Sequence, residues 1–332
     1  MDLEQLCAEG ISLSEDSLFV TIMGLKSFCA FAGVISVLLI TYFEDLTKSF
    51  HKNARMIVYL HFGMVAISAT GSLLSDGYDF LRFTAIKSMN IEEDCSVHPF
   101  SARVGASFKL IKIFGTSGII GTIFAWSLER LCATIFAKSY EKKSSKLGAS
   151  LCLVAIGLAI VDVSVHLSRI DFSALLSMVS VTKPAIDISM KFYYGLAAIE
   201  IVSVLLLGCI WIMNVRYNSI KSRIFSTLAY KSQIQENIEA VSFMFPVAFI
   251  HCFFGLTAAL IVPSIALSIE DPLHKAKSIA EFDLVVLYYV VLPITLFWRN
   301  YVKRRNSKRV LELQVRRDSL NQHFVMLRKL FN

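Results

Sequence analysis

Residues 105–142 read GASFKLIKIFGTSGIIGTIFAWSL followed directly by ERLCATIFAKSYEK. The first part, 105–128, is mostly apolar and long enough for a helix to cross a hydrocarbon core about 30 Å thick, which takes about 20 residues at 1.5 Å rise each. The second part contains five charged residues, three of them basic, and begins with the adjacent pair Glu129 and Arg130. This change of composition predicts a transmembrane helix that leaves the bilayer near Leu128.

The rest of the chain repeats the pattern of an apolar block followed by a charged segment. The 332 residues are 55% hydrophobic and only 18% charged, whereas about a quarter of a soluble domain is charged. We therefore predict an all-α membrane protein, a seven-transmembrane helix bundle, with a short amino-terminal segment (1–17) and a tail (299–332). The predicted spans are 18–43, 56–74, 105–128, 147–166, 192–215, 241–269 and 282–298.

The distribution of basic residues predicts the orientation of these spans. Segments that follow the odd-numbered spans hold 22 Lys and Arg, and the segments on the other face hold 8. Because basic segments stay in the cytosol, we expect an extracellular amino terminus and a cytosolic carboxyl terminus in the plasma membrane. The net charge of +7 then needs no nucleic-acid partner, since membrane orientation accounts for it.

The tail shows the spacing of an amphipathic helix. Its apolar residues recur at intervals of three, four and seven, and basic residues lie between them. Such a helix is suited to lie on the anionic lipids of the inner leaflet. The apolar positions are Val310, Leu313, Leu320, Phe324, Leu327 and Phe331.

The Glu129–Arg130 pair has two readings. An acidic–basic pair at the end of a helix can hold that end against a neighbouring helix and release the arginine to a partner protein when the pair breaks. Alternatively, both side chains reach into the lipid headgroups. The pair alone does not decide between a switch and an interfacial anchor.

Two runs of residues extend this pair into a recognisable pattern. The sequence resembles the nematode serpentine chemoreceptors, within the superfamily of classes a, ab, b and e, and class ab most of all. In the second run Ala229, Lys231 and Ser232 depart from the usual Ser, Arg and Tyr. The matching residues are Glu129, Arg130, Ala133, Thr134, Tyr140, Glu141 and Lys142 in the first run, and Leu228, Gln233, Glu236, Asn237 and Ile238 in the second.

The resemblance implies a rhodopsin-like receptor that detects a small molecule and signals through a heterotrimeric G protein, in the cilia of sensory neurons. It places the activation switch and the G-protein contact on residues of the two runs. These are Glu129, Arg130, Tyr140, Glu141, Gln233, Glu236 and Asn237.

Charged residues inside the predicted spans indicate a second site. Each costs about 2.5–3.5 kcal/mol to insert and normally faces a partner or a cavity. Lys109 and Lys112 share a face of the third span, and Glu200 lies at a similar depth in the fifth, its neighbour in the resembled fold. We expect a Lys112–Glu200 ion pair, a ligand pocket, or both. Lys26 and Asp162 lie nearer helix ends and are expected to snorkel or line loops.

The same charged groups support an alternative, a multi-pass transporter or ion channel. Many transporters are built from repeated halves, and the sequence shows no such repeat. It also lacks a phosphate-binding loop, a zinc-protease motif and a nucleophile elbow, so we expect no enzyme, catalytic residue, metal site or cofactor. Whether the protein forms an oligomer stays open.

Two cysteines fall in the predicted extracellular segments, Cys7 and Cys95. The extracellular side is oxidising, so they either form a disulfide or remain free thiols.

Overall fold

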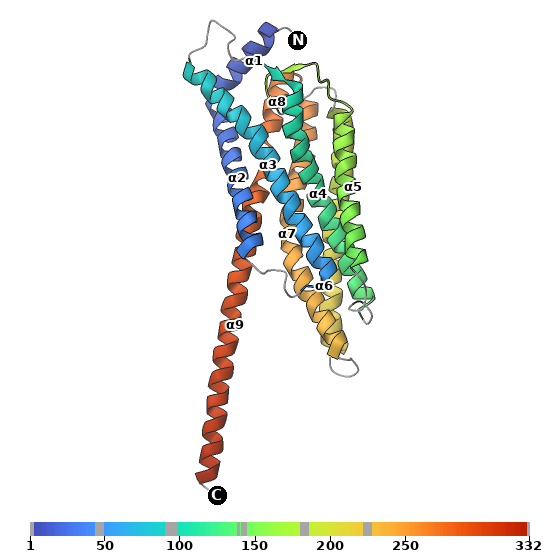
Figure 1. The fold of residues 1–332 in the computed structure, drawn as a ribbon, viewed down its shortest axis with the longest axis vertical. Helices are drawn as coiled ribbons and strands as arrows, with labels where there is room; N and C mark the ends of the chain where they lie inside the picture. Colours follow the sequence, from blue (N-terminus) through green and yellow to red (C-terminus); the bar gives the residue numbers. More distant parts are fainter. Residues whose placement is uncertain are drawn as a thin grey trace.

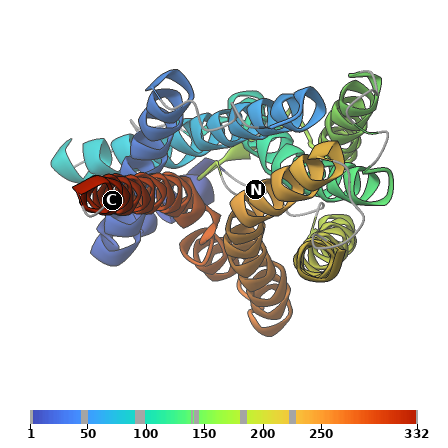
Figure 2. The same cartoon turned by 90° about the horizontal axis from the view of Figure 1, so that it is seen from below.

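The structure is a computed structural model that describes residues 3–43, 50–89, 99–137, 140, 145–179, 186–221 and 228–330. Long helices run side by side along one axis, with the amino terminus at the upper end and the carboxyl terminus far below the bundle (Figure 1). Seen from below, the helices surround a common interior (Figure 2). We use "upper" and "lower" as in Figure 1.

Seven helices of the described chain are long and apolar enough to cross a membrane. This confirms the predicted seven-helix fold. Their bounds are α2 Ser17–Phe43, α3 Lys52–Met89, α4 Ala102–Ile135, α5 Lys146–Leu167, α6 Ile186–Lys221, α7 Leu228–Ser268 and α9 Val285–Leu330.

Helices α3 and α4 pack closely against each other, because glycines line their crossing. A Cβ atom on Gly115 would lie 2.3 Å from the Ser68 backbone nitrogen, and one on Gly71 would lie 2.3 Å from that of Lys112. Small residues at such crossings let transmembrane helices pack backbone to backbone. This contact fixes the position of Lys112 in the interior.

The upper end carries four short elements: α1 Leu3–Glu15, α8 Pro272–Glu281, β1 Phe100–Ser101 and β2 Leu175–Leu176. The two strands pair antiparallel, and the Ala102 amide donates to the Ala174 carbonyl at 3.0 Å. This ladder joins the start of α4 to the segment after α5, which contains no cysteine. Backbone hydrogen bonds thus hold the two segments together.

The tail is helical, as predicted, but it continues α9 without a break to Leu330. In Figure 1 this helix projects downward along the bundle axis. The chain from 294 to 330 contains no Gly or Pro to interrupt it. The expectation of a separate helix lying on the membrane surface is therefore not met, and contact with anionic lipid stays a prediction.

Candidate functional site

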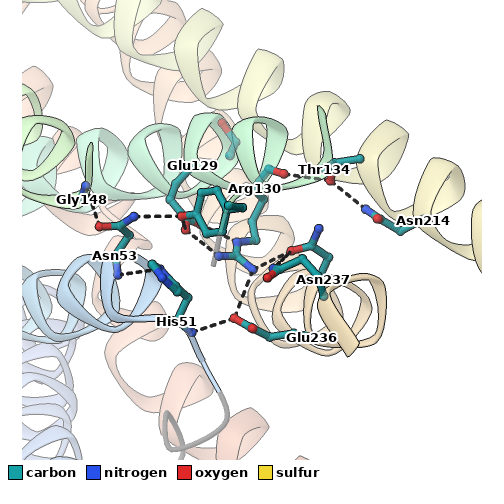
Figure 3. A network of polar contacts seen from close by, with 12 residues as sticks. His51, Asn53, Glu129, Arg130, Thr134, Gly148, Asn214, Glu236 and Asn237 are labelled. Carbon is teal, nitrogen blue, oxygen red and sulfur yellow. Dashed lines mark hydrogen bonds and ion pairs between the residues drawn. The ribbon is translucent and has the colours of Figure 1, made fainter. Parts of the chain in front are cut away.

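The lower end of the bundle holds a buried polar network around Glu129 and Arg130, in the last two turns of α4 (Figure 3). Both side chains are 0% exposed. Arg130 donates from Nε and Nη2 to the two carboxylate oxygens of Glu129, the latter at 2.5 Å. Two parallel hydrogen bonds of this kind are the strongest form of an ion pair. The predicted pair is therefore formed, inside the protein rather than in a lipid headgroup layer.

Arg130 also reaches across to α7. Its Nη1 donates to Asn237 Oδ1 at 3.0 Å and lies 4.0 Å from Glu236 Oε1. One turn earlier, Gln233 Nε2 donates to the same Asn237 oxygen at 3.3 Å. The second sequence run thus lies on the helix that Arg130 contacts. The structure brings these predicted site residues together.

Tyr140 and Asn53 extend the lower polar network to α3 and α5. The Tyr140 hydroxyl donates to Glu129, and Asn53 Nδ2 donates to Tyr140 Oη at 3.1 Å. Asn53 Oδ1 accepts from the Gly148 amide at 3.2 Å. Burial, with the Glu129 carboxylate nearby, raises the pKa of the Tyr140 phenol, so it stays protonated and donates.

Two further contacts complete the lower polar network. The His51 amide donates to Glu236 Oε1 at 2.7 Å. Asn214 of α6 donates to Thr134 Oγ1 at 3.0 Å, and that hydroxyl donates to the Arg130 carbonyl at 2.9 Å. Five helices, α3 to α7, therefore share one set of polar contacts. Glu141, also predicted here, lies outside the described residues.

His51 and Asn53 belong to a stretch that also resembles the serpentine chemoreceptors, but sequence reasoning gave neither residue, nor Asn214, a role in this network. Asn214 could have been found from the sequence, because it is an amide inside an apolar block. In the structure it is 1% exposed. Asn53 precedes the predicted second span, and its burial follows only from the packing of α3 against α5. Contacts of that kind are not visible in a sequence.

A cavity of about 240 Å³ occupies the upper half of the bundle. All three predicted pocket residues, Lys109, Lys112 and Glu200, line it. Sequence reasoning did not place the other charged groups in it. The eight charged lining residues are Lys26, Lys109, Lys112, Asp76, Asp79, Asp162, Glu200 and Asp283.

The predicted Lys112–Glu200 ion pair is wrong, because each side chain has a different partner. Lys112 forms an ion pair with Asp283, in the turn that precedes α9. Glu200 accepts from His251 Nδ1 of α7. A buried charged side chain pairs with the partner that helix packing brings close to it. The sequence did not show that packing brings Asp283 to Lys112 and His251 to Glu200.

Lys26 and Asp162 were expected to snorkel or line loops, and the structure places both side chains in the interior instead. They are 7% and 1% exposed and line the upper cavity. Lys26 Nζ donates to the Ala280 carbonyl at 2.8 Å and lies 3.5 Å from Asp76. Asp162 accepts from Ser117. Because both side chains have polar partners inside the bundle, neither extends to the membrane–water interface.

Side chains in contact lead from the upper cavity toward the lower polar network. The His251 ring lies edge-on to Tyr288, with centroids 4.7 Å apart. Tyr288 Oη lies 2.9 Å from His61 Nε2, and His61 Nδ1 lies 2.9 Å from Thr122 Oγ1 on α4. Thr122 is two turns above Glu129. The two sites thus share α4 and α7 and a chain of packed groups between them.

Among the cysteines that the structure describes, Cys7 is disulfide-bonded and the other five are free thiols. Cys95, the predicted partner of Cys7, lies outside the described residues. The Cys7–Cys95 pairing therefore stays a prediction.

A family model agrees with this architecture along almost the whole chain. The model described as "Serpentine type 7TM GPCR receptor class ab chemoreceptor" matches residues 5–332. No curated protein matches the chain.

Proposed function

Because the chain belongs to the serpentine seven-transmembrane receptor family of class ab chemoreceptors, we propose that it detects a small molecule in the upper cavity and signals to a heterotrimeric G protein at its lower end. The family is one of receptors of the G-protein-coupled type, not of enzymes. Membership also agrees with the resemblance on the two sequence runs. The chain is thus a multi-pass membrane receptor, and its ligand, coupling and location are the proposal.

The observation that carries the proposal is the burial of Arg130 between α4 and α7. The side chain is 0% exposed and holds Asn237 while paired with Glu129. A partner protein cannot reach it until the lower end of α7 moves away. This burial supports assigning the structure to a closed, inactive state of the receptor.

Ligand binding would shift the equilibrium toward an open state. A ligand does this only through a higher affinity for that state. The cavity is lined by Glu200 of α6 and by His251 and Gly255 of α7, so a ligand there contacts the helices that the lower polar network ties to α4. When Arg130 leaves Asn237, its guanidinium N–H donors become available to the G protein.

The proposed orientation puts the lower polar network in the cytosol. The basic-residue bias supports it, since the segments at the lower end hold 22 of the 33 Lys and Arg. Plasma membrane and sensory cilia are the corresponding locations. Epitope tags at the two termini of intact cells should be labelled by an impermeant antibody at the amino end alone.

A reporter assay for G-protein activation tests the proposal. Cells expressing the receptor are exposed to a panel of volatile and water-soluble metabolites, and Arg130→Ala is compared with wild type at equal surface expression. We expect at least one response that Arg130→Ala abolishes. Arg103→Ala, at an exposed position on the same helix, is the matched control and should leave it intact. Ligand-dependent current or flux that persists without G protein would favour a channel or transporter instead.

A further inference from the structure

The charges that line the upper cavity do not balance. Five carboxylates (Asp76, Asp79, Asp162, Glu200 and Asp283) face three lysines (Lys26, Lys109 and Lys112). Counting carboxylates and lysines alone, the wall has two carboxylates in excess. The two lining histidines, His166 and His251, each contact one carboxylate, Asp162 and Glu200. Buried charge of one sign is costly unless something of the opposite sign compensates it. A lining carboxylate without a close cationic partner of its own therefore favours a cation.

The protein's own lysines show what these carboxylates bind. Lys112 pairs with Asp283, and the same carboxylate lies 4.0 Å from Lys26 Nζ. Lys26 reaches the interior from α2 and also donates to a backbone carbonyl. The upper cavity therefore already holds alkylammonium groups against acid side chains. A ligand ammonium would find the same chemistry at the carboxylates that remain.

Two lining carboxylates, Asp76 and Asp162, each have an oxygen with no hydrogen-bond partner among the described residues. The Asp162 oxygen lies 3.0 Å from His166 Nδ1, so the carboxylate with room for another donor is Asp76. It is 6% exposed and lines the cavity, yet its Oδ2 atom has no hydrogen-bond partner among the residues described. Its Oδ1 atom is 3.5 Å from Lys26, a long contact for an ion pair. An unsatisfied buried carboxylate oxygen costs free energy that a donor would remove.

Glu200 adds negative charge from α6. Its Oε1 atom accepts from His251, and its Oε2 atom occupies the space that Gly255 leaves open. A Cβ atom on Gly255 would lie 2.7 Å from that oxygen. The glycine, one turn after His251, therefore sets the position of this carboxylate.

The size and remaining lining of the cavity limit the ligand. At about 240 Å³ the cavity is smaller than the sites that hold drug-sized molecules, roughly 300–1,000 Å³. Part of the lining, including Ile120, Leu196 and Val262, is apolar. No three acidic, histidine or cysteine side chains of the described chain converge to hold a metal ion. A small organic cation with an apolar body fits these conditions.

We propose that the upper cavity binds a small primary amine, with its ammonium group held by Asp76 and its apolar part against α6 and α7. This inference names the ligand class for the receptor function proposed above and rests on it. It also makes a claim about binding that holds without any signalling measurement.

Thermal unfolding of the purified full-length receptor tests the ligand class directly, because a ligand that binds only the folded state raises the melting temperature. The probes are two sets matched in shape and differing in charge: 2-phenylethylamine, 2-phenylethanol and phenylacetate, and isopentylamine, isopentanol and isovalerate. We expect an amine to raise the melting temperature and its alcohol and acid not to do so. Stabilisation by an acid instead, or by neither amine up to millimolar concentration, would overturn the proposal.

Two variants locate the ammonium group. Asp76→Asn keeps the shape of the side chain and removes its charge, and we expect the dissociation constant of the amine to rise about 10- to 100-fold, as for the loss of a charged hydrogen bond.

Gly255→Ala displaces the Glu200 carboxylate and should weaken amine binding several-fold. Gly157→Ala on α5, where a Cβ meets nothing within 4 Å, is its control and should bind as wild type. Unchanged affinity in a folded Asp76→Asn variant would contradict the assignment, and Gly255→Ala keeps the test open if Asp76→Asn does not fold.

The two proposals fail separately. If amines stabilise the purified receptor but no G-protein response appears in cells, the ligand class stands and the signalling function is wrong. If a G-protein response dependent on Arg130 follows an acidic or neutral ligand instead, the receptor function stands and the amine assignment is wrong.

Discussion

The lower polar network and the upper cavity are both built from charged and polar side chains, but these side chains are arranged differently. In the lower network, Glu129, Arg130 and Tyr140 are all 0% exposed and bonded to one another. In the upper cavity, charged groups from α2 to α6 and from the turn before α9 surround open space, and Asp76 keeps an oxygen without a hydrogen-bond partner among the described residues. In the lower network the charged groups are paired, and only amide atoms of Asn214, Gln233 and Asn237 lack a hydrogen-bond partner among the described residues. A network whose charges are paired can stabilise a closed state, whereas a charged oxygen left without a partner can bind a ligand.

The largest effect is expected from breaking the lower network at its centre. Glu129→Ala leaves the Arg130 charge buried and unpaired, which should lower the free energy of unfolding by about 3–5 kcal/mol. Thermal unfolding and surface expression measure it. Glu270→Ala, at an exposed position, is the control and should have little effect. Removing both charges in Glu129→Ala/Arg130→Met should recover most of the loss; no recovery would mean that the pair is not its source.

A charge exchange in the upper cavity separates the observed pairing from the one predicted from sequence. Lys112→Asp alone should cost on the order of 2 kcal/mol, less than the loss at Glu129, because the two side chains of the Lys112–Asp283 pair are still 19% and 23% exposed. Adding Asp283→Lys should restore surface expression. Adding Glu200→Lys to the same variant should not, since Glu200 pairs with His251. If Glu200→Lys rescued Lys112→Asp and Asp283→Lys did not, Lys112 would pair with Glu200, as the sequence predicted.

The two regions also differ in how far the sequence revealed them. The lower network is built largely from two continuous runs, so the family pattern by itself indicates Glu129, Arg130, Tyr140 and Asn237. The upper cavity takes one or two charged residues from each of α2 to α6 and one from the turn before α9. Asp76 and Asp79 were assigned to a loop, because hydropathy ends a span where charges begin, whereas α3 continues to Met89.

The reason for that error is physical. A charged residue ends an apolar pattern in the sequence, but it does not end a helix when a partner such as Lys26 meets it inside the bundle. Which helix supplies the partner depends on tertiary packing, and that packing cannot be predicted from the charge and hydropathy pattern of a single sequence. The seven-helix fold, by contrast, follows from the length and apolarity of the blocks alone.

A milder change should loosen the lower network without unfolding it. Tyr140→Phe removes the hydroxyl that donates to Glu129 and accepts from Asn53, which should cost about 1–2 kcal/mol. The Tyr140 hydroxyl helps to hold Glu129, which positions Arg130 against Asn237 of α7, so we expect higher basal activity in the G-protein reporter assay. Tyr301→Phe, at a position 58% exposed, is the matched control. Basal activity that stays at the wild-type level would show that Tyr140 does not help to stabilise the closed state.

The smallest effect concerns acid, and it should distinguish the upper end of the molecule from the lower. Asp16 caps α2 by accepting from the Leu18 and Phe19 amides at 3.1 Å, and its ion pair with Lys277 together with these amides lowers its pKa. A lowered folded-state pKa stabilises the protein above the unfolded-state value, near 3.8, and that contribution disappears as the pH falls through the folded-state pKa.

Asp16→Asn keeps an oxygen that can cap the helix but does not titrate. The difference in unfolding free energy between wild type and Asp16→Asn should therefore be constant near neutral pH and shrink below about pH 4. Tyr140→Phe should show no such change, because the raised pKa of Tyr140 keeps the phenol protonated throughout the acid range. An Asp16→Asn difference that stays constant down to about pH 2 would show that the Lys277 contact contributes no stability through the charge of Asp16, leaving the amide hydrogen bonds as the whole function of this residue.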